Sequence, residues 1–579
     1  MIVDCLHLPD GVEIQAECCI IGAGPAGITV ANELLRSGAD VMLLESGGRK
    51  TRRATQELSK GEVIDTDRHG ALHRYRHRRF GGTTDVWGGR CAPFDPIDFE
   101  PRPYVAWSGW PISRADLDPY YAIAHEYCEL GEYTYVAREA LAAEVAGNLP
   151  GFAGLPVLSE FIWRFSLPTD FGKTFWKPFS AARNLRVYLH ATALQLRTRP
   201  NGDGVDGLDV GSPGGKRFAV KARHFIVATG GIEAARLLLV SRDTGAQGLG
   251  NSRDLVGRFY ISHITGDLGH VAFSPDAAAL MAHYARTRDN VYCRRALSIS
   301  ERKQREAELL NFRAILSHPC PANPTHSSGV LSAIYLVKRF LADRIPPEYS
   351  RALSGLSPIH QYSAHFRNVL KDWRSVAGFA ALWGRKRVLS RRKLPSVVHK
   401  SKSNVYTLHF DAEQAPNPNS RVMLSDAIDE FGFNRLKVDW RCTDQDIDSV
   451  VKCAAIIAAA LRDSGAGKCL FDPERLGPMI AQNTGVGSHY IGTTRMAGTP
   501  AAGVVDSNCK VFGLENLYIA SSSVFPTSSF ANPTLTIIAL AVRLANQLVP
   551  YRSIRISRPE ARREDTRDSR GDRETANAR

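Results

Sequence analysis

Three features of the sequence predict an α/β protein whose main sheet is interrupted by a second, α+β domain. Residues 17–48, ECCIIGAGPAGITVANELLRSGADVMLLESGG, have the pattern of a buried strand, a glycine turn, a helix and a second buried strand. Residues 224–240, HFIVATGGIEAARLLLV, repeat the strand, glycine turn and helix, and we assign them to the same sheet. Glycine turns and buried runs return after residue 485. The first domain is therefore predicted to be discontinuous.

Length and composition agree with two domains. The chain has 579 residues, of which 44% are hydrophobic, so it can bury a large core. The formal charge of +14 is spread along the chain, and no signature of a nucleic-acid-binding module occurs. We interpret the charge as surface charge and expect no nucleic-acid partner.

Cysteine usage indicates a reducing compartment. The eleven cysteines include no CxxC pair, and Cys18 and Cys19 are adjacent in a predicted strand, so neither a disulfide framework nor a metal site is expected. The first residues lack a basic segment followed by an apolar one, and no apolar run is long enough to span a membrane. We expect a soluble, cytoplasmic protein.

The middle of the chain has a different hydrophobic pattern. Amphipathic helical stretches are followed by alternating, strand-like segments at 404–414 and 434–441. Residues 373–410 contain nine Lys and Arg and no acid, which predicts a basic surface, with membrane or partner docking as the alternative. The predicted domains are 1–100, 186–266 and 480–550 for the first, 101–185 and 267–479 for the second, and a disordered charged tail at 551–579.

The first glycine turn predicts a Rossmann-like dinucleotide-binding domain. Gly22, Gly24 and Gly27 form GxGxxG between strand and helix, and Glu45 follows Gly22 by 23 residues, the spacing of an acid that contacts the adenosine ribose. This motif does not separate FAD from NAD.

Two further loops favour FAD. FGGTTDVWGGR, residues 80–90, places four glycines around Thr83 and Trp87, which suits a backbone that passes close to a flat ligand. ATGG, residues 228–231, lets the chain approach the dinucleotide from the other side. A nicotinamide dehydrogenase needs only the first turn.

These motifs resemble the glucose-methanol-choline family of FAD oxidoreductases. The resemblance runs from IIGAGPAG through ATGGIEAARLL to GSHYIGTTRMAG and the block GVVDSNCKVFGLENLYIASSSVFPTSSFANPTLTIIALA, and is weakest between about 270 and 400. The Asn-Pro-Thr version of the last block is similar to the pyranose oxidase branch and related bacterial sugar and glycoside oxidoreductases. The resemblance implies an FAD-binding domain with an inserted substrate-binding domain.

The same resemblance implies the catalytic residues, His489 and Asn532. His489 is expected to accept the hydroxyl proton of a sugar, glycoside or polyol while hydride passes to flavin N5. Asn532 is expected to bind the substrate oxygen and to cap the apolar helix that starts at Pro533, whose N-terminus would stabilise charge on the reduced flavin.

The full prediction for non-covalent FAD binding comprises Gly22, Gly24, Gly27, Glu45, Gly81, Gly82, Thr83, Trp87, Gly88, Ala193, Ala228, Gly230, Ser521, Asn532, Pro533 and Thr534. Two positions depart from the family. Val86 stands where flavin-linking members carry a His, which excludes a covalent bond there, and Ser521 replaces an Asp near the ribityl chain.

Other histidines receive structural interpretations. His263 resembles a family position on the substrate side, but we expect it to be structural. His69, His73 and His77 have helical spacing, yet the surrounding arginines and the lack of a completing carboxylate or Cys disfavour a metal, so a solvated or anion-facing surface is expected.

Two alternatives stay open. A lyase of the same family could keep FAD without using its redox chemistry, and a silent binding protein could present the basic 373–410 surface. The sequence leaves open whether oxygen, a quinone or a protein accepts the electrons. Trp107 and Trp110, in WSGWPI, are expected to offer flat faces to a sugar.

Overall fold

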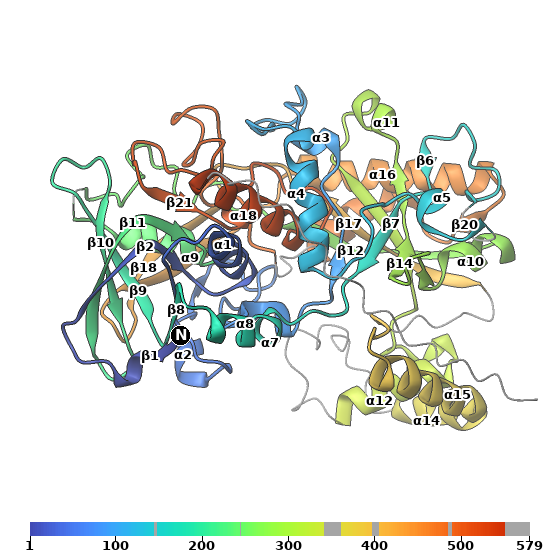
Figure 1. The fold of residues 1–579 in the computed structure, drawn as a ribbon. Coiled ribbons are helices and arrows are strands. Elements are labelled where there is room, and N and C mark those ends of the chain that lie inside the picture. Colours follow the sequence, from blue (N-terminus) through green and yellow to red (C-terminus); the bar gives the residue numbers. More distant parts are fainter. Residues whose placement is uncertain (144–146, 244, 341–360, 397–403, 484–488, 550–579) are drawn as a thin grey trace, which may run out of the picture.

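The computed structural model describes residues 1–143, 147–243, 245–340, 361–396, 404–483 and 489–549. The predicted tail at 551–579 lies outside these ranges. Figure 1 shows one large sheet on the left and a second group of strands on the right, with α1 (Pro25–Arg36) and α18 (Thr534–Leu548) over the left-hand sheet. The chain is thus an α/β fold with more than one sheet.

The large sheet is built as the βαβ pattern predicts. Its central strands run parallel because each is followed by a crossover, and a hairpin extends one edge. The strand order is β1 (Ile2–Asp4), β8 (Leu185–Leu189), β3 (Val41–Glu45), β2 (Glu13–Ile21), β11 (Arg217–Val227), β10 (Val205–Gly211) and β9 (Thr192–Thr198), with β21 (Leu517–Ile519) also beside β11.

The predicted second strand–glycine–helix crossing does belong to this sheet. Strand β11 pairs in parallel with β2, with Val227 opposite Ile21, and leads into α9 (Glu233–Val240). The two glycine turns therefore lie side by side at the carboxyl end of the sheet, where ligands bind in doubly wound folds.

The other sheets are smaller. An antiparallel one has the order β20 (Gly467–Cys469), β12 (His263–Phe273), β17 (Val405–Glu413), β16 (Phe312–Ser317), β15 (Leu297–Ile299) and β6 (Val157–Leu158). A four-stranded sheet contains β13 (Ala285–Arg286), β14 (Tyr292–Arg295), β7 (Ile162–Phe165) and β5 (Arg90–Cys91). A three-stranded one contains β18 (Arg421–Ile428), β19 (Asn434–Asp439) and β4 (Gly61–Val63).

The two largest hydrophobic clusters of the described residues centre on the large sheet and on the antiparallel sheet. The first packs the large sheet against α1, α18 and α4 (Arg114–Tyr127), and the second packs the antiparallel sheet against α16 (Asp444–Asp463) and α17 (Leu476–Asn483). Strands β4 and β5 come from residues 1–100 but pair with strands of the predicted substrate domain. The domain boundaries given above stay a prediction.

Candidate active site

A cavity of about 620 Å³ opens at the carboxyl ends of β2, β3 and β11 and extends to the N-terminus of α18. Of the residues predicted to hold the cofactor, all except Gly27 and Gly81 line it. The two exceptions lie behind the wall, where close contact with neighbouring backbone requires a glycine. A Cβ on Gly27 would lie 1.9 Å from the carbonyl oxygen of Gly22, and a Cβ on Gly81 would lie 2.3 Å from the backbone nitrogen of Gly172.

The first turn needs its glycines. Gly22 has φ +105°, and a Cβ there would lie 2.6 Å from the carbonyl oxygen of Ala228. The first helical hydrogen bond of α1 runs from Ile28 N to Gly24 O, so the earlier N–H groups of the helix are available at the cavity wall. This is the geometry of an anion site at a helix N-terminus.

Glu45 closes the turn from the neighbouring strand. One carboxylate oxygen accepts the N–H of Ala23 at 3.0 Å, and the other accepts the N–H of Gly47 at 2.8 Å. Burial raises the pKa of Glu45, although these bonds oppose the shift. The side chain both holds the turn and lines the cavity, where its unused lone pairs can accept hydrogen bonds from a ligand.

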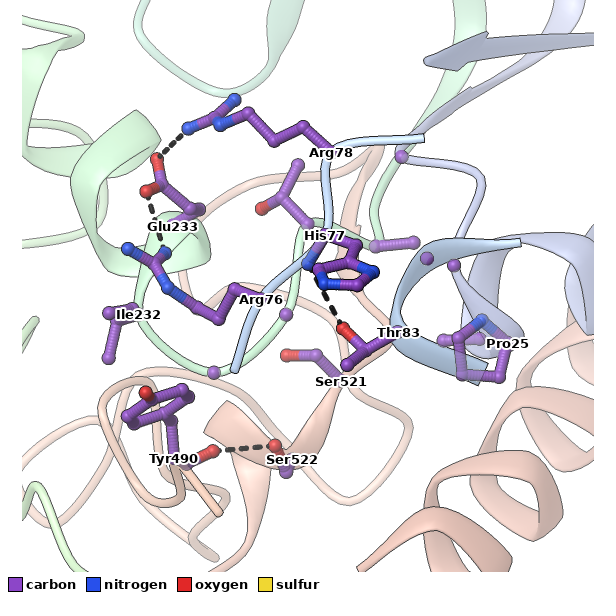
Figure 2. Close-up of a pocket in the computed structure, with 18 of the residues that line it drawn as sticks. Pro25, Arg76, His77, Arg78, Thr83, Ile232, Glu233, Tyr490, Ser521 and Ser522 are labelled. Atoms are coloured by element: carbon purple, nitrogen blue, oxygen red, sulfur yellow. Dashed lines mark hydrogen bonds and ion pairs between the residues drawn. The ribbon is translucent and has the colours of Figure 1, made fainter. Parts of the chain in front are cut away.

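The histidine- and arginine-rich stretch lies largely inside the fold, so the solvated-surface alternative is wrong. Figure 2 shows Arg76 and Arg78 on either side of Glu233, with N–O distances of 2.8 and 3.0 Å. Burial would raise the pKa of Glu233, but Arg78, Arg76 and Arg236 outweigh it and hold the pKa at about 2. This arginine–glutamate cluster lines the cavity.

Two of the three histidines of that stretch also lie inside the fold, His69 and His77. His69 is buried and bonds the hydroxyl of Tyr260 at 2.8 Å. His77 lines the cavity and lies 3.0 Å from Asp85. The segment forms turns rather than a helix, so the apparent helical spacing had no structural meaning.

The glycine-rich loop at residues 80–90 lines the other side of the cavity. Residues Gly82–Asp85 form the short helix η2, and Thr83 accepts the N–H of His77 at 3.3 Å (Figure 2). The indole N–H of Trp87 donates to the carbonyl of Thr169, which turns the ring edge into the protein. By contrast, Trp110 is a core residue that donates to Thr527, and neither it nor Trp107 lines the cavity. The expected aromatic sugar platform is therefore wrong.

The apolar C-terminal helix begins one residue after the predicted Pro533, and the prediction that Asn532 caps it is wrong. Helix α18 starts at Thr534, with Pro533 as the flanking residue, and no side chain caps it. The amide of Asn532 is engaged elsewhere, with Arg90 and His489. Pro533 and Thr534 line the cavity, so the N-terminus of the helix still faces it.

His489 and Asn532, the two predicted catalytic residues, lie in contact at the cavity wall. The amide nitrogen of Asn532 is 3.1 Å from Nε2 of His489. On its far side, Nδ1 of His489 is 2.7 Å from Nδ1 of His263, and Nε2 of His263 is 3.0 Å from the carbonyl oxygen of Ser528. His263 therefore contacts the predicted base, which our structural interpretation did not anticipate.

This chain of contacts assigns the protons from both ends. Arg90 can only donate, so Oδ1 of Asn532 faces it and the NH₂ group faces His489, whose Nε2 must accept. At the other end a carbonyl can only accept, so His263 carries its proton on Nε2 and accepts at Nδ1. His489 is thus the neutral tautomer with a proton on Nδ1 and a lone pair on Nε2.

Arg90 is held in turn by a buried carboxylate. Its guanidinium makes two bonds to Asp411 on β17, of 2.8 and 2.9 Å, and its Nε donates to Asn532 at 2.9 Å. Burial would raise the pKa of Asp411, but the Arg90 charge keeps it below its usual value. The sequence did not single out either residue, although Arg90 directly follows the glycine loop.

Electrostatics keep both histidines neutral. Burial lowers the pKa of His489 well below its usual range, with further contributions from His263 and Arg90. Burial also lowers the pKa of His263. A neutral imidazole with a lone pair on a nitrogen at the cavity wall is the required form of a general base.

The cavity suits a dinucleotide. A Cβ built on Gly24 or Gly230 would meet nothing within 4 Å, so at both turns the backbone itself is presented to the open space. The hydroxyl of Thr229 between them has no partner in the described part of the chain. Ala193 and Ser521 complete the wall. A backbone cradle at a helix N-terminus fits a pyrophosphate, and the adjoining volume fits a flat ring system.

Two family descriptions match the chain on either side of its middle. The family described as FAD dependent oxidoreductase matches residues 17–255, and that described as GMC oxidoreductase matches residues 416–541. The chain therefore combines an FAD-dependent oxidoreductase domain with a GMC oxidoreductase domain. The first match contains the glycine cradle and the second contains His489 and Asn532, so the cofactor is FAD.

Similarity to individual proteins extends over nearly the whole chain. Paromamine 6'-oxidase from Streptomyces fradiae is 26% identical, covering 91% of this chain and 90% of its own. 2-Methyl-1,2-propanediol dehydrogenase from Mycolicibacterium austroafricanum is 24% identical, covering 92% and 95%. Among solved structures, pyridoxine 4-oxidase from Mesorbium loti has a TM-score of 0.53 at 17% identity, covering 92% of this chain and 99% of that chain. That likeness supports the fold.

Proposed function

We propose that this GMC oxidoreductase oxidises a hydroxyl group of a sugar, glycoside or polyol to a carbonyl, with His489 as the general base. The observation that carries the proposal is the proton assignment of His489, which directs a neutral acceptor nitrogen into the FAD cavity next to the amide of Asn532. The substrate class is supported by the two relatives, which are named for paromamine and for a diol.

The side chains suggest how a substrate alcohol is bound. The substrate hydroxyl replaces the bond between Asn532 and His489, accepting the amide N–H and donating its own proton to Nε2. When bound, FAD supplies the two-electron acceptor for the hydrogen on the carbinol carbon. Loss of the proton to His489, and of that hydrogen with its electron pair as hydride, leaves the carbonyl product.

His263 and Arg90 then have distinct supporting roles. His263 accepts the Nδ1 proton of His489 throughout, so the imidazolium formed by proton transfer keeps a partner in the buried site. Arg90 holds the Asn532 amide in the one orientation that presents a donor to the substrate oxygen.

The FAD is proposed to be bound without a covalent link. The supporting observations are the backbone cradle and Val86, which lines the cavity without a nucleophilic atom. Acid precipitation should release free FAD, whereas yellow protein in a denaturing gel would indicate another attachment point, such as His77. Replacing Glu45 with Ala should weaken FAD retention with little change in the chemistry of the remaining holoenzyme, because its expected contact is the ribose.

A reducing, cytoplasmic location is also proposed. All eleven cysteines are free, and most are buried among apolar side chains. Within the described ranges, the structure has no helix that is both long and apolar enough to cross a bilayer.

One experiment tests the function against its alternatives. Under anaerobic conditions, the purified holoenzyme is mixed with sugars, glycosides, small diols, long-chain alcohols and a hydroxynitrile, and the flavin absorbance is followed. Bleaching by polyhydroxy compounds is the expected result. Preferential bleaching by a hydrophobic alcohol would overturn the substrate class, and cleavage of the hydroxynitrile without bleaching would establish the lyase alternative.

A further inference from the structure

A group of three helices projects from the second half of the molecule. These are α12 (Gly329–Phe340), α14 (Tyr362–Lys371) and α15 (Trp373–Trp383), followed by the helical turn η7 (Gly384–Leu389). Figure 1 shows the three helices together at the lower right, apart from the sheets. They pack chiefly on one another. We call residues 329–340 and 361–396 the helical unit.

The helical unit exposes far more apolar surface than the rest of the chain. Of the fourteen large hydrophobic side chains that are exposed in the described ranges, eight belong to it. Leu370 is 74% exposed, Trp373 59% and Leu389 82%. Helix α15 has a single charged residue, Arg374, and none of its eleven residues is buried. A concentration of exposed apolar side chains on one small unit marks an interaction site.

The same unit is strongly basic. It contains eleven Lys and Arg and one acid, Asp372. Arg367, Lys371 and Lys386 are exposed and form no salt bridge in the described part of the chain. On α14, Phe366 and Leu370 share one exposed face, since they are four residues apart, and Arg367 and Lys371 flank that face. An apolar ridge flanked by unpaired cations is the pattern of a helix that lies in a membrane interface.

We propose that the helical unit docks this oxidoreductase on the surface of a bilayer that contains anionic phospholipids. Trp373, Leu370 and Leu389 would enter the headgroup boundary, and the unpaired cations would contact lipid phosphates. Charge decides between the possible occupants. A second copy of the unit would bring two strongly basic surfaces together, and residues 551–579 contain nine Arg against six acids, so neither complements the patch.

The unit is fixed to the body of the enzyme, so docking would orient the whole molecule. The guanidinium of Arg392, just after η7, donates to the carbonyls of Phe165 and Glu129 at 3.3 and 3.1 Å. Phe165 is the strand partner of Arg90, which lies at the cavity wall. The docking surface and the active site are therefore connected through β7.

The test uses the full-length, FAD-loaded protein and 100-nm vesicles of phosphatidylcholine, either pure or with about 30% phosphatidylglycerol. Binding should require the anionic lipid and should fall with rising salt. The triple variant Arg367→Gln/Lys371→Gln/Lys386→Gln should bind anionic vesicles about 100-fold more weakly, at about fivefold for each charge. Leu370→Ser/Leu389→Ser should lose about tenfold or more. All variants should keep their FAD and its anaerobic reduction by substrate.

Matched controls lie on other faces of the molecule. Ile428→Ser removes a side chain that is 62% exposed on β18, and Arg302→Gln removes an 80% exposed cation on α11 (Glu301–Glu306), at the top of Figure 1. Both should bind like wild type. Vesicles should shift the tryptophan emission to the blue, and Trp373→Phe should abolish that shift while vesicle binding is largely kept.

Three outcomes would overturn the proposal. Equal binding to neutral and anionic vesicles would remove the electrostatic argument. Equal losses in the control variants would mean that the patch is not the docking surface. A dimer in solution that the Leu370→Ser/Leu389→Ser variant converts to a monomer, with no vesicle binding by wild type, would assign the surface to a second copy.

Discussion

The Nδ1 atoms of His263 and His489 lie 2.7 Å apart, and this contact determines which nitrogen of His489 is the base. Because His263 also donates to a backbone carbonyl, it can only accept from His489. The lone pair of His489 is therefore on Nε2, which lies beside Asn532.

Loss of the base should slow catalysis without loss of cofactor. His489→Ala should reduce the rate of anaerobic flavin reduction by substrate by ~10²–10⁴, the usual contribution of a general base, or roughly 3–5 kcal/mol of barrier. The measurement is stopped-flow absorbance with the FAD content checked. His365→Gln is a matched control, since His365 is buried outside the cavity. An unchanged rate in His489→Ala would assign the base elsewhere.

The pH profile should reflect the lowered pKa of His489. The imidazole accepts a proton only while it is neutral, and its pKa lies well below 6.5 because of burial. The second-order rate of flavin reduction should therefore hold steady as the pH falls from 8 to 6.5 and should decline only below that. An acidic limb centred at or above 6.5 would contradict this assignment.

Arg90→Lys tests the orientation of the Asn532 amide. Lysine keeps a cation beside Asp411 but loses the forked guanidinium that holds Oδ1 of Asn532. The freed amide can then turn its oxygen toward His489, which favours protonation there, so the acidic limb should move to higher pH. Combining Arg90→Lys with Asn532→Ala should cost little more than Asn532→Ala alone. If the losses of rate in the two variants added up and the acidic limb of the pH profile did not move, Arg90 would act only on stability.

Asn532→Asp should change the reduction potential of the bound flavin more than the stability of the fold. Since the side chain does not cap α18, the helix should form in both Asn532→Asp and Asn532→Ala. A carboxylate at the cavity wall should lower the reduction potential of the bound FAD, because it opposes the negative charge of the reduced form. Asn532→Ala should shift the potential less. Equal potentials in both variants and wild type would mean that this position does not face the flavin.

Glu233, at the cavity wall, should make the free energy of unfolding depend on pH in the acidic range. Its folded pKa is about 2 against a usual value of 4.5, so its contribution is present above pH 4.5 and is lost as the pH falls toward 2. Glu233→Gln leaves Arg76 and Arg78 facing each other without a carboxylate and should lower the free energy of unfolding at pH 7 by ~3–5 kcal/mol. Urea titrations at pH 7 and 4 measure this. The variant should lose less stability on acidification than wild type does.

Local patterns were sufficient to predict the sheet and the glycine cradle. A βαβ unit is encoded within some thirty residues, and glycines such as Gly22 are required by their own backbone angle and one close neighbour. The family motifs also brought His489 and Asn532 together correctly. These features depend on short-range rules that a sequence displays directly.

Features that depend on distant partners were missed. Arg90 and Asp411 are 321 residues apart, and neither one alone differs from a surface residue. Asn532 has the ideal residue type for an N-cap, but tertiary bonds to Arg90 and His489 outweighed that local preference. The basic stretch around Arg76 was expected on the surface because Glu233, which pairs with it, lies 157 residues away.

The bond between Arg90 and Asn532 spans 442 residues of the chain. During synthesis, the strand that carries Arg90 leaves the ribosome long before the amide that it must hold, and the glycine cradle can be complete while the base is still without its orienting partner. Contacts of such long range also form late in folding. Catalytic activity therefore reports on the complete assembly of this enzyme.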